Sequence, residues 1–398
     1  MKLFRYGLFS SLICFLLSGH LQVLADAVQP TATTDRAFLI YSIPHLQNWS
    51  ITNKIDKTQT RLTQISIPWT AQLWLSNRTR MVLTQSSAIS EFNLDKLEDQ
   101  DKSELTLQGM GDIRLKIKHQ LLDSLMVIAG TNFPTGKTGI DPETDEEEVL
   151  KHLFNDALDF QTGRLGEGWA FDIGTAYARQ LAGITFGIGA NYLYKNTYLR
   201  QLLNDPRRKV NYNPGTDISF TSGFSAGSVL QFHSDFTYII HTRQTIRGTG
   251  VFDEEKNYFE QGPDLLVDGG ITYKRQRLQL DIFGQLLDRE DSSRPDVSKN
   301  NRLEIVDVNQ NNRRRYVLRI MYQTGGSSTI SATVEDKLLE DQNQERVASI
   351  LSYYLDSHFQ LANPIGLTFG LKISNGKMNE GQTRLSGYGC YAALTTGF

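Results

Sequence analysis

The chain of 398 residues is poor in cysteine, in long apolar runs and in charge of one sign. It holds two cysteines, and Cys14 lies in an N-terminal apolar stretch, so Cys390 has no disulfide partner once that stretch is removed. A mean hydropathy of −0.34 excludes a bundle of membrane helices. The net charge of −3 argues against a nucleic-acid partner, because phosphate binding needs surplus lysine and arginine. The sequence has neither a Cys/His cluster with metal-ligand spacing nor a glycine-rich phosphate loop, and we predict no metal or cofactor.

The first 27 residues have the layout of a secretory signal peptide. Lys2 and Arg5 precede a short apolar stretch over residues 8–17, and Ala25-Asp26-Ala27 offers an A-x-A cleavage site. The apolar stretch is too short to cross a bilayer as a helix. We predict a cleaved signal peptide over residues 1–27 and one exported domain over 28–398. A hydrophobic content of 39% is too high for disorder, so this domain is either a soluble all-β protein or a membrane β-barrel.

From residue 61 onward, hydrophobicity alternates with a period of two, which is typical of strands with two different faces. The predicted strands are residues 61–75, 78–89, 109–121, 124–133, 169–180, 183–195, 216–224, 227–240, 265–274, 277–287, 313–324, 327–335, 347–358, 365–374 and 387–398. A sixteenth strand is required if the sheet closes with both termini on one side, and residues 37–52 are left for it. We therefore predict an all-β, transmembrane up-and-down antiparallel barrel of about 16 strands, with 14 as the alternative. Short turns would face the periplasm, and long loops the exterior.

The two faces of these strands favour a membrane barrel over a soluble protein. One face is almost entirely apolar, and a membrane barrel turns that face to lipid and the charged face to a wet lumen. Aromatic side chains on the apolar face would form two rings at the headgroup levels. The outer ring is Trp169, Tyr194, Tyr238 and Tyr316, and the inner ring is Tyr177, Tyr273, Tyr322 and Tyr353.

Charged and ionisable side chains on the other face are predicted to line the pore. They are Arg114, Lys116, Lys118, Asp172, His233, Asp235, Asp268, Asp281, Arg315, Arg319 and Lys372. Their signs are mixed, whereas a strongly ion-selective pore shows one sign in its narrow part. Two roles stay open at this point: these charges set selectivity, or they pair with one another and brace the barrel wall.

The longest connection, residues 134–167, is strongly acidic. Its acids include Asp141, Glu143, Asp145, Glu146, Glu147 and Glu148. Three interpretations are open: a hydrated surface loop, a loop folded into the lumen as a constriction, or a calcium site. Sixteen-stranded porins place their constriction loop after strand 5, as here. Oxygen ligands for calcium are plentiful, but their spacing does not match an EF-hand.

Two stretches suggest an enzyme and do not support one. In His233-Ser234-Asp235, alternation turns Ser234 to the opposite face of the strand, which breaks a nucleophilic triad. Outer-membrane phospholipases carry the motif His-x-Ser-Asn-Gly, and Lys372 occupies the histidine position of the similar stretch at residues 372–376. We predict no enzymatic activity.

Two resemblances point to the outer membrane. The last strand, with Tyr388 facing outward and Phe398 at its end, resembles the closing strand of Gram-negative outer-membrane proteins, which implies recognition by the barrel assembly machinery. Residues Asn132-Phe133-Pro134-Thr135-Gly136-Lys137 resemble the outer-membrane family named for the MetA pathway of phenol degradation, and Gly166-Glu167-Gly168-Trp169 is similar in layout. The resemblance implies a transport-type barrel for small apolar or aromatic compounds.

The sequence predicts an outer-membrane channel that passes small solutes by diffusion through a charged lumen restricted by the acidic loop. We expect a monomer or a homotrimer in outer-membrane lipid. The alternative is a closed outer-membrane barrel that binds a partner at the cell surface, and a soluble secreted β-protein comes third.

Overall fold

The structure is a computed structural model and describes most of the chain. The described residues are 38–96, 102–137, 149, 152–153, 155–162, 165–202, 209–248, 256–290, 292–297, 303–308, 311–325, 328–341, 343–362 and 365–397. The predicted signal peptide and Phe398 lie outside them. In this part of the chain, no helix is long and apolar enough to cross a bilayer.

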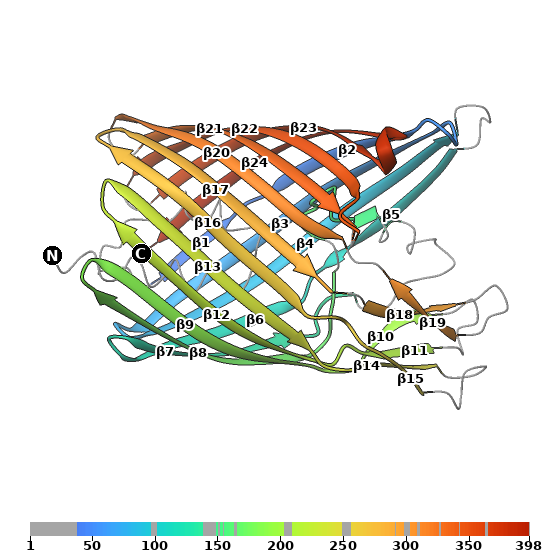
Figure 1. Ribbon diagram of the computed structural model, residues 1–398, viewed down its shortest axis with the longest axis horizontal. Coiled ribbons are helices and arrows are strands. Elements are labelled where there is room, and N and C mark those ends of the chain that lie inside the picture. The colour runs from blue at the N-terminus through green and yellow to red at the C-terminus, as the bar shows by residue number, and fades with distance from the viewer. Residues whose placement is uncertain are drawn as a thin grey trace.

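The strands form one closed antiparallel barrel (Figure 1). Its segments are β1 (Phe38–Ser42), β2 (His45–Asn53), β3 (Thr58–Ser76), β4 (Thr79–Lys96), β5 (Lys102–Met110), β6 (Ile113–Leu122), β7 (Leu125–Phe133), β8 (Ala170–Leu181), β9 (Ile184–Lys195), β12 (Thr216–Gly227), β13 (Leu230–His241), β16 (Asp264–Arg275), β17 (Leu278–Arg289), β20 (Asn312–Gly325), β21 (Ser328–Glu340), β22 (Arg346–Ala362), β23 (Ile365–Met378) and β24 (Thr383–Gly397). The barrel closes where β1 and β2 pair with both β24 and β3. A 3-10 turn, Asn379–Gly381, joins β23 to β24.

The 18 segments of this sheet make 16 barrel strands, because two strands are each built from two segments. The first is β1 with β2, which keep one register across the break, with Ser42 opposite Trp69 and His45 opposite Ser66. The break falls at Pro44, which has no N–H to donate to the ladder. The predicted count of 16 is confirmed, and residues 37–52 do supply the missing strand.

The second interrupted strand corrects the prediction of a continuous strand over residues 109–121. Ala88 of β4 lies opposite Gly109 of β5, whereas Thr84 lies opposite Arg114 of β6, so the register shifts by one residue between them. Gly111 and Asp112 occupy this shift as a β-bulge. The bulge gives Asp112 its place on the inner face, where it holds the ends of the long loop, as described below.

The outer wall of the barrel is apolar, as expected for a surface in lipid. Ile173 is 63% exposed, Ile188 61% and Leu371 58%, although all three are large aliphatic side chains. Short turns, together with the start of β1 and the end of β24, lie at one end of the barrel, and the long connections lie at the other (Figure 1). We call these the turn end and the loop end. The fold is therefore a transmembrane β-barrel.

The loop end holds structure that period-two alternation did not predict. Strands β10 (Tyr198–Leu202), β11 (Lys209–Asn213), β14 (Gln244–Gly248) and β15 (Lys256–Phe259) form a four-stranded sheet, and β18 (Ser292–Val297) pairs with β19 (Leu303–Val308). Strands β3 and β4 also extend further toward the loop end than predicted. Tyr353 lies near the middle of β22 rather than near its inner end, because β22 continues to Ala362.

Candidate functional site

The side chains predicted to line the pore all lie on the inner face of the barrel. On β20, Leu318 and Ile320 are exposed on the outer wall, so Arg315 and Arg319, offset by an odd number of residues, face inward. The same alternation turns His233 and Asp235 inward and Ser234 outward on β13, where the Ser234 hydroxyl donates to the Asp268 carbonyl at 3.1 Å. Ser374 also faces inward and is hydrogen-bonded to Ser352 at 2.8 Å.

Many of the inward charges are paired with one another. Arg315 lies 2.6 Å from Glu335, Arg319 lies 2.8 Å from Asp281, and Lys116 lies 3.7 Å from Asp172. In addition, the Lys372 ammonium lies 5.1 Å from the centre of the Tyr354 ring. Of the two roles left open by the sequence, the structure shows the pairing, between adjacent strands for Arg315–Glu335 and Arg319–Asp281 and across β7 for Lys116–Asp172. The role of these residues in selectivity stays a prediction.

The neutral polar side chains between these charges complete the network. Gln285 donates to Asp268 at 2.8 Å, Thr272 donates to Asp281 at 2.8 Å, and Tyr354 donates to Glu335 at 3.2 Å. Asp356 accepts from Ser331 at 3.2 Å and from the Tyr391 hydroxyl. A carboxylate buried in a protein is stable only when charged or polar donors satisfy it, and these donors do so.

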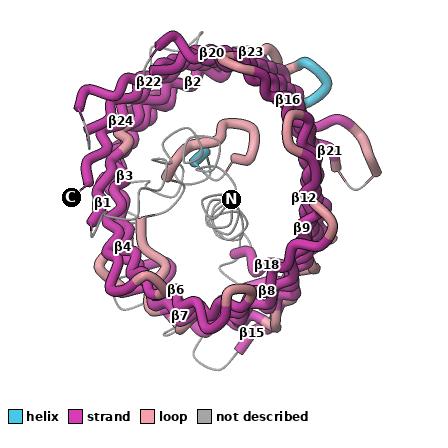
Figure 2. Tube along the Cα trace, turned by 90° about the vertical axis from the view of Figure 1, so that its left-hand side faces the viewer, coloured by secondary structure: helices cyan, strands magenta, loops and turns pink. Residues whose placement is uncertain are grey.

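Part of the long acidic loop lies inside the barrel (Figure 2). We call the described part of residues 149–162 the inserted segment. Its apolar side chains form a cluster with inward side chains of the wall at the loop end. The cluster comprises Val149, Leu153, Ala157, Leu158 and Phe160 of the segment, Leu165, and Trp49, Leu62, Ala88, Phe92, Leu107, Leu339, Ala348, Ile350 and Leu385 of the wall. The predicted acids Asp141, Glu143, Asp145, Glu146, Glu147 and Glu148 lie outside the described residues.

Lys337 of β21 attaches the inserted segment to one side of the barrel. Its ammonium group donates to the Asp159 carboxylate at 2.5 Å and to the carbonyls of Asp156 and Ala157 at 3.0 and 2.9 Å. The Lys337 side chain is only 3% exposed. Arg289 of β17 adds an ion pair to Asp156 at 2.6 Å. Sequence reasoning missed Lys337, because the predicted strand ended at residue 335 and β21 continues to Glu340.

Two glutamines attach the segment to β2 and β3. Gln64 of β3 donates to the Thr162 carbonyl at 2.8 Å and accepts from the Thr162 N–H at 3.1 Å. Gln47 of β2 donates to the Asp159 carbonyl at 3.1 Å and accepts from the Gln161 N–H at 3.2 Å. Each side-chain amide therefore supplies the segment backbone with two hydrogen bonds of the kind that a neighbouring strand would otherwise provide. The segment therefore lies inside the barrel against the arc of wall that runs from β17 and β21 through β24 to β2 and β3.

Asp112, at the bulge between β5 and β6, holds the two ends of the long loop together. Its carboxylate accepts from the N–H groups of Gly136, Glu167 and Gly168 at 2.8, 2.6 and 3.0 Å. It also accepts from the Asn132 amide at 2.8 Å. The Pro134-Thr135-Gly136 and Gly166-Glu167-Gly168 stretches singled out in the sequence are thus the two ends of one loop. We call this arrangement the Asp112 clamp.

The clamp leaves no space for a side chain at Gly166. A Cβ there would lie 2.8 Å from the carbonyl carbon of Gly136 and 2.9 Å from the carbonyl oxygens of Gly136 and Lys137. Gly166→Ala is therefore expected to lower the free energy of unfolding by about 2 kcal/mol, because backbone has to move. Urea unfolding in phospholipid vesicles, followed by tryptophan fluorescence, measures this. Gly325→Ala, where a Cβ meets nothing within 4 Å, is the control; equal loss in both variants contradicts the prediction.

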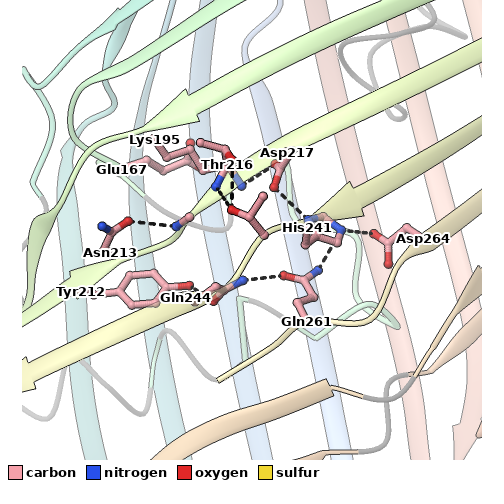
Figure 3. Close-up of polar contacts among 12 residues, drawn as sticks. Glu167, Lys195, Tyr212, Asn213, Thr216, Asp217, His241, Gln244, Gln261 and Asp264 are labelled. Carbon is pink, nitrogen blue, oxygen red and sulfur yellow. Dashed lines mark hydrogen bonds and ion pairs between the residues drawn. The ribbon is translucent and has the colours of Figure 1, made fainter. Parts of the chain in front are cut away.

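A second polar cluster lies at the loop end of the opposite wall (Figure 3). His241, the last residue of β13, has one ring nitrogen 2.8 Å from Asp217 and the other 3.4 Å from Asp264. Lys195 lies 2.5 Å from the second oxygen of Asp217. The Gln261 side chain joins His241 to Gln244 of the loop-end sheet. This cluster ties four barrel strands to that sheet, and nothing in the local sequence pattern indicated it.

Among the described residues, no group of three or more His, Cys, Asp or Glu side chains is placed to hold a metal ion. The calcium interpretation concerned the acids at residues 141–148, which the structure does not describe. No cofactor site is proposed.

No protein-family model matches the chain, and no curated protein matches it. The resemblance of residues 132–137 to the MetA-pathway family is therefore not confirmed. Similar solved structures include the monoaromatic hydrocarbon channel CymD, at 14% identity and TM-score 0.39, covering 96% of this chain and 93% of that chain. A TodX mutant monoaromatic hydrocarbon channel has 7% identity, TM-score 0.46 and coverages of 92% and 91%. OccK7 (OpdD) of Pseudomonas aeruginosa has 9% identity, TM-score 0.44 and coverages of 92% and 100%.

Proposed function

We propose that this protein is an outer-membrane channel of a Gram-negative bacterium that passes small solutes by diffusion, with the inserted segment as its restriction. The observation that carries the proposal is the inserted segment itself, which lies inside the barrel and is attached to Lys337 of β21 and to Gln64 of β3. A segment fixed inside a barrel of this strand number narrows the passage without adding a separate plug domain.

The wall formed by β7, β8, β9 and β12 supports a passage beside the segment. Its inward positions include Gly130, Gly174, Gly187, Gly189 and Gly223, and the Asp172 and Asp235 carboxylates lie over Gly130 and Gly223. The facing wall of β16 to β23 carries the pairs Arg315–Glu335 and Arg319–Asp281. Solutes would therefore pass between a wall of small residues and a polar wall.

Small apolar or aromatic compounds are the solute class we propose. The resemblance at residues 132–137 supports it, and so does the inward apolar cluster of Met126, Ile128 and Ala176. Because Arg315, Arg319 and Lys116 are paired with acids, their fields largely cancel at a distance. We expect weak ion selectivity.

Single-channel conductance in planar bilayers tests the restriction. Deletion of residues 143–160 is expected to raise the conductance several-fold, because most of the segment that occupies the lumen is removed. Arg243→Ala is the control, since Arg243 forms an exposed ion pair with Glu260 outside the lumen. An unchanged current after the deletion contradicts the restriction role. A correctly folded but silent wild-type barrel contradicts the channel.

A closed barrel that binds a partner at the cell surface is the second candidate. The observation that favours it is the ordered sheet of β10, β11, β14 and β15 at the loop end. The same bilayer measurement separates the two functions, because a surface-binding barrel gives no stable conductance steps.

A further inference from the structure

Three basic side chains lie on the outer face of the barrel at its loop end. Arg61 of β3, Lys377 of β23 and Arg384 of β24 are all exposed, and alternation places them on the same face as the apolar belt. Lys377 and Arg384 lie directly opposite each other on adjacent strands. Like charges in this position repel and destabilise a sheet, so the arrangement needs a counter-charge.

No acidic side chain of the described residues lies within ion-pair distance of these cations, although Glu91 faces outward diagonally from Arg61. None of the three side chains has an ion-pair partner among the described residues. By contrast, Arg314, which also faces outward near the loop end, lies 3.0 Å from Glu340 of the adjacent strand. Arg61, Lys377 and Arg384 differ from Arg314 in having no such partner in the part of the chain that the structure describes.

Neutral hydrogen-bonding side chains lie between the three cations. Asn375 is opposite Ser386, Ser386 is opposite Ser50, and Ser50 is opposite Arg61, so these four residues form one row across the strands. Lys377 and Arg384 lie in the next outward row, two residues nearer the loop end. Asn375 and Ser386 are exposed. These amides and hydroxyls donate and accept hydrogen bonds, as sugar hydroxyls do.

The apolar belt begins directly beside this row. Two residues nearer the turn end, Ile373 lies opposite Tyr388, and each is 59% exposed on the outer face. An exposed Ile–Tyr pair of this kind is typical of the boundary between hydrocarbon and headgroups. The three cations therefore lie at headgroup depth in the leaflet at the loop end.

We propose that Arg61, Lys377 and Arg384 bind the phosphate groups of a phosphorylated glycolipid in that leaflet. The cations would pair with phosphate oxygens, the amide and hydroxyl row would contact the sugar, and the acyl chains would lie along the apolar belt. This inference rests on the membrane setting of the proposed function, but it requires no conduction.

Binding of diphosphorylated lipid A to the full chain in phosphatidylcholine nanodiscs tests the inference by native mass spectrometry. The double variant Lys377→Gln/Arg384→Gln is expected to bind about tenfold more weakly or worse, since each cation near a charged surface contributes about 1 kcal/mol. Arg179→Gln is the matched control, because Arg179 is exposed on the outer face of β8 near the turn end. Its affinity should equal that of the wild type.

Two results would overturn the inference. One is equal affinity of the double variant and the wild type for diphosphorylated lipid A. The other is wild-type binding of dephosphorylated lipid A or of phosphatidylglycerol as strong as that of the diphosphorylated form. Conductance of the same preparations keeps the two proposals apart: a silent barrel that binds the glycolipid contradicts only the channel, and a conducting barrel that does not bind contradicts only the glycolipid site.

Discussion

Lys337→Met is expected to raise the single-channel conductance several-fold and to make the current noisier than that of the wild type. The substitution keeps the length and volume of the side chain and removes its charge. The inserted segment then loses three hydrogen bonds, to Asp159 and to the carbonyls of Asp156 and Ala157. Breaking a buried pair by removing one partner costs about 3–5 kcal/mol, because the remaining charge keeps its desolvation penalty. The segment avoids this cost by leaving its place in the lumen.

A second substitution tests whether the unpaired Asp159 carboxylate causes the expected rise in conductance. Asp159 has a φ of 53°, a left-handed backbone conformation that asparagine tolerates well, so Asp159→Asn keeps the local fold. In the Lys337→Met background it removes the unpaired charge, and the current is expected to return toward the wild-type level. A double-mutant cycle on conductance and on urea stability measures this coupling. If the two substitutions act additively, Lys337 and Asp159 do not hold the segment as a pair.

Asp112→Ala is expected to lower the free energy of unfolding by about 3 kcal/mol or more. The clamp satisfies the N–H groups of Gly136, Glu167 and Gly168 and one N–H of the Asn132 amide, and alanine removes this acceptor from all four, two of them in buried hydrogen bonds. Each unsatisfied buried donor costs about 1–3 kcal/mol. Water reaches some of these donors in the variant, so the total loss stays below the sum of four such costs. The same change separates the ends of the long loop, so the conductance should also rise.

Two comparisons make this test specific. Asp112→Asn retains one acceptor oxygen and should lose less stability than Asp112→Ala, since three of the four donors converge on one carboxylate oxygen. Asp123→Ala removes an exposed aspartate whose ion pair with Arg78 spans 3.7 Å, and it should change the stability by less than about 1 kcal/mol. Urea unfolding in vesicles measures all three. Equal losses of unfolding free energy for Asp112→Ala and Asp123→Ala would show that Asp112 does not stabilise the ends of the long loop.

The sequence predicted the barrel well where the pattern was local. Alternation on β20 assigns Leu318 to lipid and Arg319 to the lumen from neighbouring residues alone, and the structure places both there. The sequence-based prediction was wrong where alternation is broken. Gly111 and Asp112 form a bulge, which a period-two pattern does not contain. The consecutive leucines Leu338 and Leu339 interrupt the alternation, so the continuation of β21 past Lys337 was not predicted. The loop-end sheet was missed because its strands are short and polar.

What the sequence alone determined is a transmembrane barrel of 16 strands, because a bilayer requires every backbone group to pair and one face of every strand to be apolar. Only the tertiary structure decided what the barrel contains. Lys337 and Asp159 lie 178 residues apart, Gln64 and Thr162 lie 98 apart, and Asp112 and Glu167 lie 55 apart. Contacts over such separations depend on the closure of the barrel, which brings the inner faces of distant strands around one lumen, and no local pattern carries that information.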